Sequence, residues 1–225
     1  MKPVQKILAV LGSAALFLTG SGFTNDDEET FDPDSLKNYQ EEYKSTSVGV
    51  CSTSSTKVYE DYRLITSVSS AQYQYIHNHM TVDEKTGFLL NEDGFIGVAM
   101  GYLFGEIGTE YYIELDTGVT IPVVKVDAKA AVDATNGCSA NHDASVIEFV
   151  IDSDIAYAYF GGNNGLVSNG NFNNQDDFSG NIQDIRLVSD EKIEDGVLYE
   201  ARPDTLKKSD ETADAFQPVL GGYSK

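Results

Sequence analysis

The sequence predicts a mainly β domain with one or two short helices. Through the middle of the chain, runs rich in Val, Ile, Tyr, Phe and Thr recur at intervals of roughly 8 to 15 residues. Glycine, aspartate and asparagine separate these runs, as expected of turns. Many short strands with such turn signals are typical of a small β-barrel or β-sandwich.

The first half of this domain predicts a strand and a helix. Residues 57–68 (KVYEDYRLITSV) alternate loosely between apolar and polar side chains, which favours a strand. The serine pair at 69–70 then provides caps for a short helix over residues 71–79. After an Asp-Gly turn at 93–94, the run FIGVAMGY predicts a short apolar strand.

The second half predicts a hairpin and two further strands. Asp116 and Gly118 lie between TEYYIEL and TIPVVKV, and glycine supplies the positive φ that a tight turn needs. The run SVIEFVI at 145–151 is the strongest strand signal in the chain. A last strand is predicted in GNIQDIRLV, after a Gly/Asn-rich loop.

The N-terminal residues have the layout of an export signal. Lys2 and Lys6 precede an apolar run over about 7–18, and small residues follow at 19–21. We therefore expect residues 1–24 to be a secretory signal peptide. An uncleaved membrane anchor is the alternative, although a span needs about 20 apolar residues. After signal removal we expect no stable membrane span.

Composition divides the rest of the chain. Residues 25–49 are acidic and poor in apolar residues, which predicts a disordered tether. Residues 50–190 hold the β domain with an N-terminal extension. Residues 191–225 have mixed charge and no apolar period, which predicts a flexible C-terminal tail.

Charge and cysteine content narrow the setting. The 225-residue chain has a formal net charge of −21, which argues against nucleic-acid phosphates and anionic lipid as partners. It suits a secreted or cell-surface protein. Cys51 and Cys138 could form a disulfide in an oxidising compartment, or they could remain two thiols.

Three short motifs, in order, resemble those of a known family. They are IGT at 107–109, VD at 126–127 and IEF at 147–149. They are similar to the P-L-G-T turn, the D-x-G aspartate and the I-D-hydrophobic strand of double-psi β-barrel domains in cell-wall proteins. That group includes rare-lipoprotein-A-like proteins, the 3D domain, the catalytic region of murein transglycosylase A and the expansins. The resemblance covers about residues 93–155 and is nearest to uncharacterised secreted bacterial members.

The resemblance implies a fold and a class of ligand. The fold would be a small six-stranded double-psi β-barrel, and the partner would be peptidoglycan or another cell-wall glycan. Two functions remain open: a non-catalytic binding module and a lytic transglycosylase-like enzyme that cleaves the glycan. Binding is slightly favoured, because the sequence has DAK at 127–129 in place of D-x-G and Glu148 in place of aspartate.

Asp127 and Glu148 are the candidate catalytic residues. Glycan cleavage needs a carboxylic acid that protonates the glycosidic oxygen. Glu148 lies among apolar residues of its strand and could hold a proton, while Asp127 could stay ionised beside Lys125 or Lys129. Alternatively, Asp127 caps a turn, and Glu148 faces solvent or forms a buried ion pair with one of these lysines.

Five residues are candidates for substrate binding. Tyr102 could offer an aromatic platform to a sugar, and His142 beside Asp143 could form a polar pair, although neighbours on a strand face opposite ways. The full set is Tyr102, Thr109, Lys129, His142 and Asp143.

No metal site or cofactor is predicted. His77 and His79 are two residues apart, and two ligands alone make no closed site. The Asn/Asp-rich stretch at 169–177 lacks the spacing of an EF-hand loop.

Overall fold

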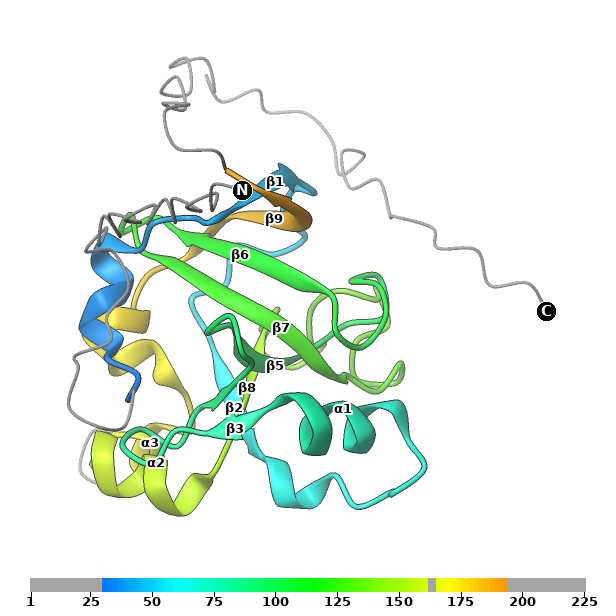
Figure 1. The fold of residues 1–225 in the computed structure, drawn as a ribbon, viewed down its shortest axis with the longest axis vertical. Helices are drawn as coiled ribbons and strands as arrows, with labels where there is room; N and C mark the ends of the chain where they lie inside the picture. Colours follow the sequence, from blue (N-terminus) through cyan, green and yellow to red (C-terminus); the bar gives the residue numbers. More distant parts are fainter. Residues whose placement is uncertain (1–29, 162–164, 194–225) are drawn as a thin grey trace, which may run out of the picture.

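The computed structural model describes residues 30–161 and 165–193 (Figure 1). The predicted signal peptide at 1–24 lies outside these residues, as does most of the predicted C-terminal tail. Among the described residues, the dominant element is one mixed β-sheet, so the prediction of a mainly β protein is confirmed.

The sheet has nine strands in its described part, rather than the six expected of the double-psi barrel. Its main path runs β1-β9-β6-β7-β5-β4-β3, and β8 joins β5 to β2. The strands are β1 (Tyr43–Ser47), β2 (Val58–Asp61), β3 (Thr81–Val82), β4 (Leu89–Leu90), β5 (Ile96–Met100), β6 (Glu110–Leu115), β7 (Thr120–Ala128), β8 (Glu148–Ile151) and β9 (Ile182–Lys192).

The sheet is open, so the expectation of a closed barrel is wrong. Strand β5 pairs along its whole length with β7, in parallel. Its other edge is shared between β4, which pairs at Ile96, and β8, which pairs at Val98 and Ala99. The sheet therefore branches at β5 and ends at β1, β2 and β3, among which no pairing is found in the described residues. A barrel requires its terminal strands to pair with each other.

The predicted hairpin and strands are present. β6 and β7 pair antiparallel around the turn at Gly118, which has φ +85°. β5 and β8 fall within the apolar runs predicted for them. Of the strand predicted over 57–68, only the short strand β2 forms. It ends where the 3₁₀ turn η2 (Tyr62–Leu64) begins, capped by the Asp61 side chain.

The described helices are short. α1 (Ala71–His79) forms where predicted and is capped by the hydroxyl of Ser70. α2 (Ser153–Phe160) and α3 (Leu166–Asn169) follow β8, and the side chain of Asp152 caps α2. The remaining helical turns are η1 (Pro33–Asn38), η3 (Phe172–Asn174) and η4 (Asp176–Phe178).

Two hydrophobic clusters pack on the sheet. The larger cluster contains a group of packed aromatic rings, in which Phe149 contacts Phe88, Phe172 and Phe178. The smaller cluster includes Ala99. Alternate residues of β5 belong to the two clusters, which is why this strand is buried on both faces.

The described part of the expected tether, residues 30–49, is ordered against the domain. Phe31 and Leu36 are buried in the larger cluster, and β1 pairs with β9. The backbone N–H of Phe31 donates to buried Asp83, 2.9 Å away. Acidic composition concealed these contacts, because two buried apolar side chains suffice to anchor a short segment. At the other end, β9 extends into the predicted tail and ends at Lys192.

Cys51 and Cys138 form a disulfide, with 6.3 Å between their Cα atoms. Disulfides persist mainly in oxidising compartments, which supports the expectation of an extracytoplasmic protein. Across residues 30–161 and 165–193, no helix has the length and apolar character needed to cross a membrane.

Candidate functional site

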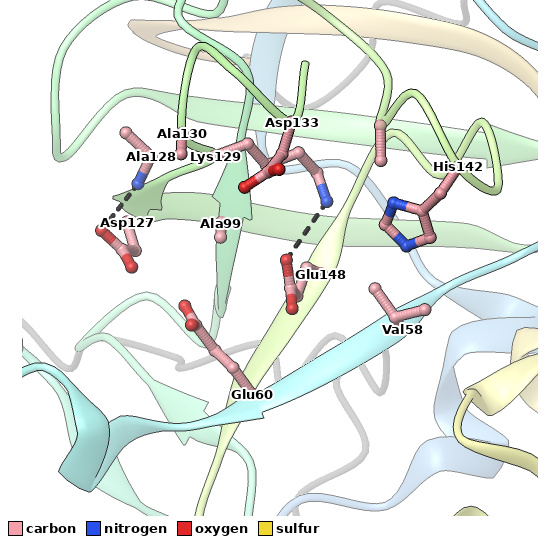
Figure 2. Close-up of a pocket in the computed structure, with 11 residues that line it drawn as sticks. Val58, Glu60, Ala99, Asp127, Ala128, Lys129, Ala130, Asp133, His142 and Glu148 are labelled. Carbon is pink, nitrogen blue, oxygen red and sulfur yellow. Dashed lines mark hydrogen bonds and ion pairs between the residues drawn. The ribbon is translucent and has the colours of Figure 1, made fainter.

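A cavity of about 370 Å³ opens beside the branch point of the sheet (Figure 2). Strands β2, β5, β7 and β8 and the loop after β7 form its walls. Its lining residues are Val58, Glu60, Ala99, Asp127, Ala128, Lys129, Ala130, Asp133, Ala140, His142 and Glu148. The site therefore contains both candidate catalytic carboxyls, together with two that were not predicted, Glu60 and Asp133.

Strand register explains why Asp127 and Glu148 meet. Ala99 of β5 pairs with Asp127 of β7 on one side and with Glu148 of β8 on the other. Paired residues in a sheet present their side chains on the same face. Asp127, Ala99 and Glu148 therefore form a row across three strands. The small side chain of Ala99 leaves space between the two carboxyls, and this space is part of the cavity.

A β-bulge selects Asp127 for this row. Val98 pairs with Lys125, yet the next residue of β5, Ala99, pairs with Asp127, so β7 carries one extra residue at this point. Without the bulge, Val126 would face Ala99. Bulges are common beside functional sites because they redirect a side chain.

Glu60 is one of the two carboxyls of the site that the sequence did not predict. It lies on β2 two residues after Val58, which pairs with Glu148, so both β2 residues face the cavity. Figure 2 shows the carboxyls of Glu60, Asp127 and Glu148 pointing into the same space. The alternation in VYED predicts that Glu60 and Val58 lie on the same face of their strand. Only the parallel pairing of β2 with β8 places that face at the cavity.

The Glu60 carboxyl is desolvated and close to other carboxyls. Its Oε1 is buried and has no hydrogen-bond partner among the described residues. Burial, then a hydrogen bond with Asp127, then the charges of Asp127 and Glu148 raise the pKa of Glu60 to about 8, against a smaller opposing effect of Lys129. Two carboxyls can share a hydrogen bond only when one of them is protonated, so Glu60 is the natural carrier of that proton.

Lys129 pairs with Glu148 rather than with Asp127. The distance from Lys129 Nζ to Glu148 Oε2 is 3.2 Å, and the lysine side chain is 5% exposed. An ion pair of Glu148 with Lys125 or Lys129 is one of the alternatives that the sequence allows, and the structure contains the pair with Lys129. Asp127 accepts instead from the backbone N–H of Ala128, at 2.7 Å.

Lys125 is directed away from the cavity. Its Nζ donates to the carbonyl oxygens of Gly101, at 3.0 Å, and Gly105, at 2.8 Å. Burial lowers the pKa of this lysine. Lys125 therefore supports the loop after β5, and the expectation that it could pair with Asp127 is not met.

Residues 129–145 form the loop over one side of the cavity. This loop contributes Lys129, Asp133 and His142 to the lining. The side chain of Asn141 accepts from Thr135 and donates to the Val132 carbonyl. These hydrogen bonds connect the two ends of the segment 132–141 within the loop. The disulfide at Cys138 ties the same loop to the segment before β2.

Three predicted binding residues do not line the cavity. Asp143 contacts His142, with 3.3 Å between Oδ2 and Nε2, and also caps the backbone of Ser145. Tyr102 is half exposed and stands against Gly137. Thr109 donates to the Glu106 carbonyl and belongs to a turn. Lys129 and His142 are thus the predicted binding residues that line the cavity.

The described residues contain no group of three or more His, Cys, Asp or Glu side chains arranged to hold a metal ion. His77 stacks on Tyr73 of the same helix, with 3.7 Å between ring centroids. His79 lies against Tyr75, with 4.9 Å between centroids. Both rings contact neighbouring tyrosines.

No protein-family model, curated protein or solved structure matches this chain.

Proposed function

We propose that this protein acts outside the cytoplasm on a cell-wall glycan, such as peptidoglycan, and cleaves its sugar backbone. The observation that carries the proposal is the convergence of Glu60, Asp127 and Glu148 on one cavity, from three different strands. The open sheet does not reproduce the expected barrel, so the proposal rests on these carboxyls rather than on a fold.

Their arrangement suits cleavage of a glycosidic bond. Such cleavage uses one carboxyl to protonate the leaving oxygen and a second to stabilise the positive charge at the anomeric carbon or to activate the nucleophile. Asp127 and Glu148 flank β5, so their backbones are about 10 Å apart, or two strand spacings. Side chains that lean toward each other across this gap can reach both faces of one sugar ring.

Extracytoplasmic action is supported by the disulfide and by the predicted signal peptide. A glycan of the cell wall is the polymer implied by the resemblance of the three motifs. The charge of the site is consistent with this choice, because carboxylates would repel phosphate-rich polymers.

A non-catalytic glycan-binding module is the second candidate. The observation that favours it is the ion pair of Glu148 with Lys129, which already neutralises one carboxylate of the site. A binding site with no chemistry would still use such fixed polar groups to recognise sugar hydroxyls.

The test uses the full chain and purified peptidoglycan sacculi. For the enzyme, wild-type protein releases soluble muropeptides, and Asp127→Asn or Glu148→Gln lowers the rate at least 100-fold, in line with loss of acid–base catalysis. Glu84→Gln is the matched control, because Glu84 is an exposed carboxyl outside the cavity. Intact sacculi that nevertheless co-sediment with the protein would support binding alone. Intact sacculi without co-sedimentation would contradict both functions.

A further inference from the structure

We propose that Glu60, rather than Glu148, is the catalytic acid of this site, and that Asp127 holds it in place for proton transfer. This inference rests on the proposed glycan cleavage. It assigns the acid to β2, a strand that lies outside the segment carrying the resemblance.

The first argument is position. β2 pairs in parallel with β8, Val58 opposite Glu148 and Glu60 opposite Val150. Side chains two residues apart on a strand share a face, so Glu60 faces the cavity as Val58 does. It lies two residues along β2 from the position opposite Glu148. Its carboxyl points toward those of Asp127 and Glu148 in Figure 2.

The second argument is the surroundings of the carboxyl. The charged groups that act on Glu60 are Asp127 from β7, Glu148 from β8 and Lys129 from the loop after β7. Asp133 and His142 line the same cavity. Burial and the two carboxylates favour the protonated form, and Lys129 opposes them. Because Lys129 is itself engaged with Glu148, the effects of burial and of the neighbouring carboxylates prevail.

The third argument is the division of roles. The Lys129 ammonium lies 3.2 Å from Glu148, so the carboxyl of Glu148 has a cationic partner. A site that cleaves glycosides needs one carboxyl of each kind, with environments that separate their protonation. Glu60 is the desolvated member, with a buried oxygen that has no hydrogen-bond partner among the described residues.

The reaction balances with these groups. Glu60 donates its proton to the glycosidic oxygen as the bond from that oxygen to the anomeric carbon breaks, and the electron pair leaves with the oxygen. Glu148 stabilises the positive charge at the anomeric carbon. The hydroxyl of water, or of the sugar itself, then adds to that carbon, and its proton returns to Glu60, which restores the pair with Asp127.

The decisive experiment varies the leaving group. Sacculi release a sugar alcohol, which needs protonation, whereas a 2,4-dinitrophenyl glycoside of the disaccharide repeat releases a phenolate that needs none. Glu60→Gln should lower the rate on sacculi by 10²- to 10⁴-fold and change the rate on the dinitrophenyl substrate by less than about tenfold. Glu148→Gln should lower both rates, and Glu84→Gln neither.

Equal losses on both substrates in Glu60→Gln would overturn the assignment of Glu60 as the acid. So would retention of wild-type activity on sacculi by this variant. If Glu148→Gln is instead the variant that spares only the dinitrophenyl substrate, Glu148 is the acid.

A second measurement needs no substrate. Carbon-13 NMR of glutamate carboxyls in the full chain should show one that titrates near pH 8, is absent in Glu60→Gln and titrates at lower pH in Asp127→Asn. A Glu60 carboxyl with an ordinary midpoint near pH 4.5 would overturn the inference even if sacculi are cleaved. Uncut sacculi with the high midpoint present would overturn the proposed glycan cleavage, and with it the catalytic role of Glu60, but not the raised pKa of Glu60.

Discussion

A carboxyl that stays protonated at neutral pH makes folding stability depend on pH. The pKa of Glu60 in the folded chain is raised to about 8, above its ordinary value of 4.5. Between these values the folded state binds a proton that the unfolded chain releases. Stability from this group is therefore complete below about pH 4.5 and is lost as the pH rises toward 8.

At the residue scale, we predict that Glu60→Gln removes the loss of folding stability that ionisation of Glu60 causes between pH 4.5 and pH 8. The amide has nearly the same shape and cannot ionise, so the variant should resemble wild type near pH 4.5 and become more stable than wild type as the pH rises toward 8. The difference should grow by at most about 1.4 kcal/mol for each pH unit in that window. Urea unfolding at several pH values measures it. A constant difference across the window would contradict the raised pKa.

At the scale of elements, the site depends on how the loop at 129–145 meets the loop after β5. Gly101 and Gly137 approach so closely that a Cβ on Gly101 would overlap the Gly137 carbonyl oxygen. The carbonyl of Gly101 also accepts from Lys125 Nζ, which fixes it from the other side. Neither backbone can move freely, so the loop carrying His142 has a defined position over the cavity.

We predict that Gly101→Ala displaces this loop. Amide NMR shifts should change most around residues 136–142, and the free energy of unfolding should fall by about 1–3 kcal/mol, as for other overpacked sites. Gly118→Ala is the control, because its cost of about 1 kcal/mol comes from a positive φ at a hairpin turn with open space around it. The same shift pattern around 136–142 in both variants would contradict the steric account.

At the scale of the whole molecule, the disulfide connects two parts that the sheet does not pair. Cys51 lies between β1 and β2, and Cys138 lies in the loop over the cavity, 87 residues later. A cross-link over this separation lowers the entropy of the unfolded chain. It also holds the loop at 129–145 to the segment that leads into β2, the strand that carries Glu60.

Reduction of the disulfide, or replacement of both cysteines by alanine, should lower the free energy of unfolding by about 2–5 kcal/mol. Guanidinium unfolding with and without a thiol reductant gives the value. Reductant should have no effect on the double variant, which serves as the control for other actions of the reagent. An unchanged midpoint for reduced wild-type protein would show that the bond constrains little.

Local patterns predicted local features well. The helix at 71–79, the hairpin around Gly118 and the apolar strands β5 and β8 all form where propensity and turn chemistry place them. The pattern failed at the N-terminal segment, where Phe31 and Leu36 are buried despite acidic neighbours. Composition averages over a segment, whereas packing depends on a few side chains that find a partner.

The sequence by itself determined that this is a mainly β chain, and it identified Asp127 and Glu148 as the carboxyls to consider. The first conclusion follows from alternation and turn residues, which are properties of neighbouring positions. The second follows from the resemblance of the VD and IEF motifs to those of double-psi β-barrel domains. Only the tertiary structure decided that the sheet is open, that Lys129 pairs with Glu148 and that Glu60 joins the site. Each of these depends on strand register between residues far apart in the chain, and a shift of one residue would have turned the side chains to the other face.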